Sequence, residues 1–334
     1  HFARVSISIT MTNSYAATLT TDVTETAEGA AFIPDSLSPE KGNRIAPALA
    51  ALTTASALSA CGGGGNEPLQ ATQASGSDAM PKPAFDGFSY PAPTSDAEAA
   101  RFLLHAQFSA STEEIASLRS TTYVDWLNRQ FDASPGVTGW DWLNTRGYAA
   151  ISNDTAYYDN SYPADYMIWY QLMKSPDGLR KRIALALSEI CVVSLSGVDV
   201  NWRCHAMAWY WDQLVNNAFG NYRNVLQDVT LNPAMGYYLN TRGNQKENPA
   251  TGRQPDENYA REVMQLMSIG LVELNLDGTP KLDSNGKPID SYTMNDVTNL
   301  ARVFTGYDFD QSQNVPTTVP GTTRVVPNTT YTRL

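Results

Sequence analysis

The sequence predicts a mainly α-helical, multi-helix domain over residues 94–334, with a small β-meander insertion and a disordered N-terminal leader and linker ahead of it. All seven tryptophans and nearly all the tyrosines follow residue 89, whereas the first ninety residues are rich in Ala, Thr, Ser, Gly and Pro. Apolar residues after Ser95 recur mainly at helical spacing. Two tight-turn pairs, Asp277-Gly278 and Asn285-Gly286, lie close together and predict the meander.

The first helices carry start signals in their own sequence. Ser95 is a candidate N-cap for a helix whose apolar residues are Ala99, Phe102, Leu103 and Ala106. Ser111 or Thr112 can cap a second helix, because Glu113 and Glu114 in its first turn suit the helix dipole. The segment YVDWLNRQF, with one apolar side, predicts a third helix.

The middle of the chain predicts longer helices. One runs through Met173, SPDG forms a turn, and an apolar helix follows from Leu179 to about Val193. Residues 180–182, Arg-Lys-Arg, lie at its start, where the dipole disfavours cations; exposed bases are favoured over nearby acidic partners. Two further helices meet at Gly220, and the aromatic residues of WYWDQ and GYYLN indicate core rather than a sugar-stacking platform.

The leader indicates the cellular compartment. The stretch RIAPALAALTTASALSACGGGGNEP has one basic residue, a weakly apolar run and small residues ahead of Cys61. Its LSAC tetrapeptide resembles a bacterial lipobox, so we expect residues 1–60 to be a cleaved leader and Cys61 to be lipidated. Residues 61–93 have the composition of a flexible linker. The alternative is an Ala-rich tail with an incidental cysteine, because residues 11–42 carry five acids against one lysine.

Composition excludes several functions. The formal charge of -11 and the absence of a Lys/Arg cluster exclude a nucleic-acid partner. Three cysteines and three histidines do not provide a usual zinc site, and no metal or cofactor is predicted. Cys191 and Cys204 could form a disulfide or remain two buried thiols. No stretch reaches the roughly 18 apolar residues of a spanning helix, so we expect membrane attachment through lipid alone.

The stretch QPDENYAREVMQLMSIGL, residues 254–271, predicts an amphipathic helix ending at Gly270. Its predicted buried stripe consists of Tyr259, Val263, Leu266 and Met267. Glu257 and Arg261 form an i,i+4 pair on the opposite face. Asn258 and Glu262 lie at the border between the two faces. From there Glu262 could act as general acid or base, with Asn258, Arg261 and Glu257 binding substrate; an ordinary solvated helix face is the favoured alternative.

The segment after this helix predicts the meander and then another helix. Its acidic and amide side chains could bind calcium, but turn formation explains them better, because the spacing does not fit a calcium loop. Thr293 and Asp296 form a capping-box-like pair, and Gly306 ends the helix.

Four segments together carry a family resemblance: ARFLLHAQFSAS, AFGNYRNVLQDVTLNPAMGYYLN, PDENYAREVMQLMSIGLVELNLDGT and YTMNDVTNLARVFTGYDF. In order and spacing, residues 96–309 resemble the bacterial domain of unknown function 1800 family, a group of large exported proteins. The resemblance implies no established activity. Members usually continue beyond the FTG segment, so we expect the C-terminal part of the domain to be missing from this chain, which also begins with His1.

Two functions follow as hypotheses. The favoured one is an extracytoplasmic, lipid-anchored protein of the cell envelope that binds a partner protein or polymer, because no activated nucleophile, metal set or cofactor loop is found. The alternative is a carboxylate-dependent hydrolase of an envelope or extracellular polymer, with Glu262 as its acid or base.

Overall fold

The computed structural model describes residues 7–11, 17–21 and 92–333 and divides the chain into two units, His1–Ala74 and Ser75–Leu334. In the first unit, β1 (Ile7–Met11) and β2 (Ala17–Thr21) pair antiparallel, with Ile9 opposite Leu19. This pair of strands was not predicted. The rest of the predicted leader, the lipidation residue Cys61 and the linker up to residue 91 lie outside the described residues.

Helices dominate the described part of the second unit, which confirms the mainly helical prediction. The α-helices are α1 (Asp96–Ala106), α2 (Thr112–Arg119), α3 (Tyr123–Asp132), α4 (Gly139–Thr145), α5 (Tyr162–Lys174), α6 (Gly178–Ile190), α7 (Arg203–Asn216), α8 (Tyr222–Thr230), α9 (Pro233–Tyr238), α10 (Asn258–Gln265) and α11 (Met294–Val303). Two short 3₁₀ helices, η1 (Leu195–Gly197) and η2 (Thr329–Thr332), and a hairpin of β3 (Thr317–Thr318) and β4 (Val325–Val326) complete it.

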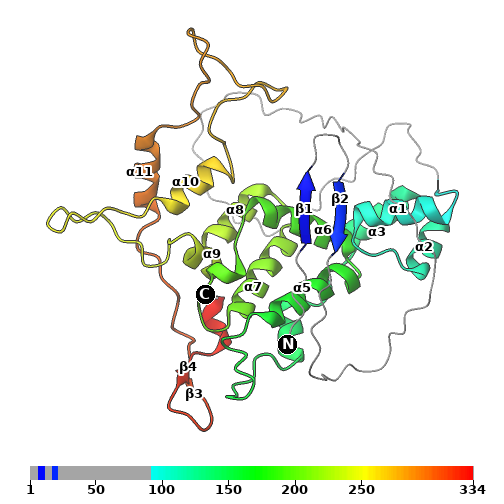
Figure 1. Cartoon of the computed structure of the whole chain (residues 1–334), viewed down its shortest axis with the longest axis horizontal. Helices are drawn as coiled ribbons and strands as arrows, with labels where there is room; N and C mark the ends of the chain where they lie inside the picture. The colour runs from blue at the N-terminus through cyan, green and yellow to red at the C-terminus, as the bar shows by residue number, and fades with distance from the viewer. Residues whose placement is uncertain (1–6, 12–16, 22–91, 334) are drawn as a thin grey trace, which may run out of the picture. The chain divides into compact units, whose positions relative to one another are not determined.

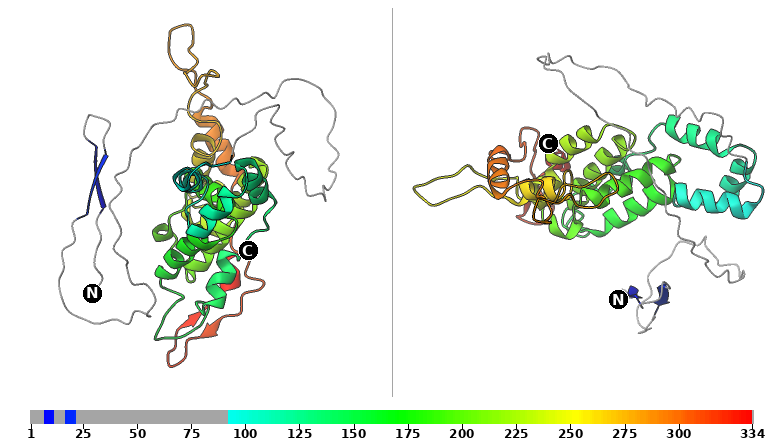
Figure 2. Two further views of the ribbon diagram at one scale, coloured as in Figure 1. Left: turned by 90° about the vertical axis from the view of Figure 1, so that its right-hand side faces the viewer. Right: turned by 90° about the horizontal axis from the view of Figure 1, so that it is seen from above.

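The predicted start signals form as expected. The Ser95 hydroxyl accepts a hydrogen bond from the Glu98 N–H, and Ser111 and Glu114 form a reciprocal capping box. Helices α1 to α3 enclose a small apolar cluster of Ala99, Leu103, Leu118 and Trp126. Figures 1 and 2 show these helices, in cyan, at one end of the second unit.

Helix α7 lies in the middle of the main core and is surrounded by other helices (Figure 1). It contacts α4, α5, α6, α8 and α9, and both 3₁₀ helices. Most of its side chains are buried, including Tyr210, Trp211 and Leu214. The WYWDQ segment therefore belongs largely to the core, as its aromatic density predicted.

Charged side chains are buried beside α7. The Asp212 carboxylate accepts hydrogen bonds from the N–H groups of Gly139 and Trp140, at 2.7 and 3.0 Å. The ammonium of Lys181 on α6 lies 3.5 Å from Asp177, and Lys181 is only 1% exposed. The prediction that the bases at this helix start are exposed is wrong for Lys181, because acidic residues surround it. Burial lowers the pKa of Lys181, and Asp177 and Asp212 oppose that change.

The C-terminal segment packs on a second aromatic cluster. Trp202, which adopts a left-handed backbone conformation (φ 60°), is buried with Tyr158, Val319, Val326 and Tyr331. Its indole N–H donates to the Pro327 carbonyl at 2.6 Å, and the Tyr331 hydroxyl donates to the Asn201 carbonyl at 2.9 Å. These contacts attach residues far along the chain to the start of α7.

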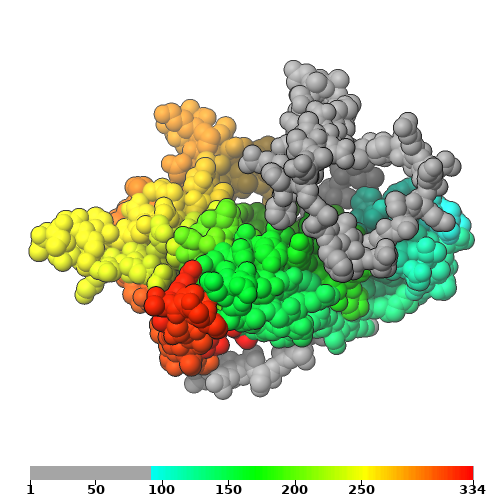
Figure 3. Space-filling view, turned by 60° about the horizontal axis from the view of Figure 1, so that its bottom comes forward, coloured from blue at the N-terminus to red at the C-terminus, as the bar shows by residue number. Residues whose placement is uncertain are grey.

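The predicted meander forms an exposed arm, defined here as residues 271–291. Gly278 and Gly286 adopt φ values of 83° and 77°, which fits the predicted tight turns. The N–H groups of Glu273, Lys281 and Ile289 donate to the carbonyls of Ile289, Glu273 and Lys281 respectively, so each of the three segments pairs with the other two. Figure 3 shows the arm, in orange, projecting from the surface.

Cys191 and Cys204 are both buried free thiols. Of the two predicted alternatives, a disulfide or two buried thiols, the structure shows the buried thiols. Burial raises the pKa of the Cys204 thiol to about 12, and its sulfur contacts the carbonyls of Asn160 and Ser161. Within the described residues, no helix combines the length and apolarity needed to cross a membrane.

Two buried groups predict opposite responses of stability to acid. Burial lowers the pKa of His205 from 6.5 to about 4, so the unfolded chain binds more protons and the free energy of unfolding falls as pH falls through this window. Burial raises the pKa of Asp212 from 3.8 to about 6, so the folded chain binds more protons and acidification stabilises it there.

We therefore expect Asp212→Asn to increase the loss of stability between pH 7 and pH 4.5, and His205→Gln to reduce it, each by on the order of 2 kcal/mol. Urea denaturation of each variant at both pH values measures the difference. Parallel pH profiles for wild type and both variants would contradict this assignment.

Candidate functional site

The predicted residues of α10 join this helix to α11. The Glu257 carboxylate lies 3.0 Å from the Arg261 guanidinium, as the i,i+4 spacing predicted, and accepts a second hydrogen bond from the Thr298 hydroxyl at 2.9 Å. Arg261 also contacts the sulfur of Met294 at 3.7 Å. Thr298 and Met294 both lie on α11, so the Glu257–Arg261 pair connects α10 to α11. Glu257 and Arg261 are each only partly exposed.

Asn258 and Glu262 differ in their surroundings. Asn258 is exposed, and its backbone N–H donates to the Asp256 carboxylate at 2.8 Å. Glu262 is half-buried, and its Oε2 is inaccessible to solvent without a hydrogen-bond partner among the described residues. Neither residue lines the polar groove described below, nor do Glu257 and Arg261. Of the four predicted site residues, Glu257 and Arg261 contact each other, whereas Asn258 and Glu262 do not join them.

Helix α10 is shorter than predicted, which changes its buried stripe. Its last helical residue is Gln265, and Gly270, with φ 76°, donates its N–H to the Met264 carbonyl in the following turn. Tyr259 and Met267 are buried as predicted, but Leu266 is 59% exposed. The helical spacing no longer applies beyond Gln265, so the prediction that Leu266 is buried is wrong.

A polar groove of about 500 Å³ lies just ahead of α10, and we call it the polar groove throughout. Two loop segments line it, 240–245 after α9 and 253–256 before α10. Its lining residues are Asn240, Arg242, Gly243, Asn244, Gln245, Arg253, Gln254 and Asp256. The chain between the two segments projects from the surface, in yellow in Figure 3.

Asn244 holds the groove together. Its buried side-chain amide donates to the carbonyls of Asp256 and Phe304, at 3.2 and 3.0 Å, and accepts from the Asp256 N–H at 2.8 Å. The Asn244 carbonyl accepts from the Gly306 N–H at 2.8 Å. One asparagine thus ties the loop after α9 both to the segment before α10 and to the segment after α11.

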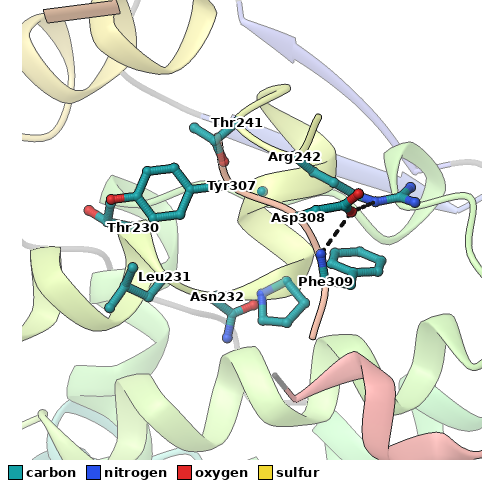
Figure 4. Close-up of a pocket in the computed structure, with 10 residues that line it drawn as sticks. Thr230, Leu231, Asn232, Thr241, Arg242, Tyr307, Asp308 and Phe309 are labelled. Carbon is teal, nitrogen blue, oxygen red and sulfur yellow. Dashed lines mark hydrogen bonds and ion pairs between the residues drawn. The ribbon is translucent and has the colours of Figure 1, made fainter. Parts of the chain in front are cut away.

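Arg242 connects the polar groove to a small neighbouring hollow of about 50 Å³, which it also lines (Figure 4). Its Nε donates to the Asp308 carboxylate at 2.9 Å, and its guanidinium lies 4.3 Å from the centre of the Phe309 ring. The hydrogen bond from the Phe309 N–H and the one from Arg242 hold the pKa of Asp308 below its usual range. Asp308 is therefore ionised at neutral pH and fixes the direction of the Arg242 side chain.

The remaining groups of the groove suit hydrogen bonding to a ligand. Asn240, with φ 61°, donates from its side chain to the Asp256 carboxylate at 3.2 Å. Arg253 is exposed, its Nε donates to the Lys246 carbonyl at 3.1 Å, and it makes no ion pair with any described carboxylate. Amides, guanidinium groups and one carboxylate line this one space, and such groups supply both donors and acceptors.

No group of three or more His, Cys, Asp or Glu residues in the described part of the chain is placed to hold a metal ion. The lining of the groove offers hydrogen-bonding groups and the charge of Arg253 for recognition.

The described chain is thus a mainly helical domain whose loops after α9 and before α10 line one polar groove, and the segment after α11 is hydrogen-bonded to Arg242 and Asn244 of that groove. It belongs to the family described as Protein of unknown function (DUF1800), whose model matches residues 101–331. This confirms the resemblance that its sequence segments indicated. No curated protein and no solved structure matches the chain.

Sequence reasoning missed the groove residues Asn240, Arg242 and Asn244. These residues lie in the segment LNTRGN, residues 239–244, which directly follows the aromatic residues of GYYLN. Its run of Asn, Thr, Arg, Gly and Asn is typical of a turn with polar side chains, and this composition was the available signal. The partners of Asn244 are distant in sequence and could not be identified from it.

We expect Asn244→Ala to lower the free energy of unfolding by about 2 kcal/mol, because three hydrogen bonds are lost and buried backbone groups are left without partners. The control Asn224→Ala removes an exposed side chain from α8 and should change it by less than about 0.5 kcal/mol. Urea denaturation measures both. Equal effects of the two changes would exclude a structural role for Asn244.

Proposed function

We propose that this protein is an extracytoplasmic, lipid-anchored binding protein of the cell envelope, and that its polar groove docks a hydroxyl-rich polymer such as a glycan strand. The observation that carries the proposal is the convergence of amide, guanidinium and carboxylate groups on a hollow of about 500 Å³. Sugar hydroxyls both donate and accept hydrogen bonds, so they match this mixed set better than a purely anionic ligand would. The formal charge of -11 also disfavours a polyanion.

The position of the groove supports a polymer as its ligand. It is open to solvent, so a long chain can enter without being threaded. Hydrogen bonds to Asp308 and around Asn244 fix the surrounding backbone, and a preorganised site loses less entropy on binding.

A second candidate is the carboxylate-dependent hydrolase. It is favoured by one observation, the inaccessible Oε2 of Glu262 that has no hydrogen-bond partner among the described residues. An unpaired carboxylate oxygen close to a binding segment is the kind of group that transfers a proton in polymer hydrolysis. In this case Asn258, Arg261 and Glu257 position the substrate.

We expect Arg253→Ala to weaken binding to isolated cell-wall glycan at least about tenfold, because a charge-assisted hydrogen bond contributes about 1.5–3 kcal/mol. Arg223→Ala, which changes an exposed arginine of α8, serves as the matched control and should bind normally. Co-sedimentation of the full chain with the glycan measures affinity.

Equal binding by the two variants would contradict the groove proposal. Release of soluble sugar by the wild-type chain, lost in a folded Glu262→Gln variant, would favour the hydrolase instead.

The lipid anchor has its own test. Cys61→Ser in the full chain, expressed in a bacterial host, should remove labelling by a fatty-acid analogue and shift the protein out of the membrane fraction. Cys191→Ala, which changes a buried thiol, should leave the labelling intact. A Cys61→Ser chain that is still labelled and still sediments with membranes would exclude Cys61 as the anchor.

A further inference from the structure

An apolar cavity of about 250 Å³ lies in the main core, away from the polar groove. Side chains of α5, α6 and α7 form its walls, and Leu195 of η1 also lines it. The lining is largely apolar and includes Met207 and Trp211. An apolar protein cavity of about 150 Å³ is sufficient to bind benzene, so this cavity has room for a short alkyl chain.

One charged group, Asp165, belongs to the cavity lining. Its side chain is exposed and makes no hydrogen bond or ion pair with another described residue. Two other polar groups of the lining are already engaged, because the Ser188 hydroxyl donates to the Leu185 carbonyl at 2.7 Å and the Tyr210 hydroxyl donates to the Cys191 carbonyl. The indole N–H of Trp211 is buried and has no hydrogen-bond partner among the described residues, so it can still donate to an acceptor in a ligand. Asp165 is the charged group of the lining and can recognise a cationic end of a ligand.

Aromatic side chains surround Asp165 on the outer face of α5. Tyr162 and Trp169 lie three residues before and four residues after it, so all three share one side of the helix. Trp169 is 61% exposed, so its ring is accessible, whereas the Tyr162 ring packs against the rings of Tyr148, Tyr157 and Tyr166. A carboxylate beside an accessible aromatic ring is suited to an alkylammonium group, which is attracted by both.

We propose that this cavity binds an amphiphile with an alkyl chain and a cationic head. The alkyl chain lies between α5, α6 and α7, and the ammonium group lies between Asp165 and Trp169. A carboxylate head is disfavoured at the same place by repulsion from Asp165, and a hydroxyl head lacks the ionic attraction. Ligands of this class include single-chain amines and the choline-type lipids.

Octylammonium, octanol and octanoate test the proposal, since they share one chain and differ in the charge of the head. Isothermal titration of the full chain should give octylammonium an affinity at least about tenfold higher than octanoate, with octanol between them. Asp165→Asn should remove this preference while octanol binds as before. The control Asp154→Asn, at another exposed aspartate, should change none of the three affinities.

A cavity-filling change tests where the chain lies. Leu195→Trp puts an indole into the cavity and should weaken all three ligands alike, with circular dichroism confirming the fold. Three results would overturn the proposal: no binding of octylammonium, equal affinity of the wild type for octylammonium and octanoate, or a preference unchanged in Asp165→Asn. Unchanged affinities in a folded Leu195→Trp variant would also overturn it.

Discussion

The carboxylate of Asp212 on α7 is the contact on which the arrangement of the core depends. It accepts the first free N–H groups of α4, from Gly139 and Trp140, and it lies near the ammonium of Lys181 on α6. Because separating a buried charge from its partners costs several kcal/mol, α4, α6 and α7 cannot rotate independently. A Cβ at position 139 would lie 2.8 Å from the sulfur of Met167 and 3.3 Å from a carboxylate oxygen of Asp212, so a larger residue there would have to displace one of these side chains. Two of these helices, α6 and α7, also form walls of the apolar cavity.

A line of hydrogen bonds runs from this core to the polar groove. Gln213 on α7 accepts from the Asn232 side chain, and Asn232 caps α9 through the Ala234 N–H at 2.9 Å. After α9 the chain turns, and the Arg242 N–H donates to the Gly236 carbonyl at 2.8 Å. The groove is therefore held by α9 on one side and by Asn244 on the other, although its residues belong to loops. Rigid placement of loop side chains is what recognition through hydrogen bonds requires.

The sequence predicted features whose partners are close along the chain. The caps at Ser95, Ser111 and Thr293 each depend on a residue three positions away, and they form as expected. Lys181 and Asn244 could not be placed in this way. The burial of Lys181 follows from the meeting of α6 and α7, and the bonds of Asn244 reach 12 and 60 residues along the chain. Interactions between residues close along the chain could be predicted from the sequence, whereas contacts formed by tertiary packing could not.

The attachment of the C-terminal segment to Trp202 has a consequence for how the chain folds during synthesis. The bond from Trp202 to Pro327 spans 125 residues, and Arg324 pairs with Asp159 across 165. The aromatic cluster of Tyr158 and Trp202 therefore cannot be completed on the ribosome until residues 324–331 have emerged. Contacts of such long range slow folding, because the entropy of closing a long loop is lost before they form. Until then, the aromatic side chains of this cluster are exposed, and a chaperone can bind them.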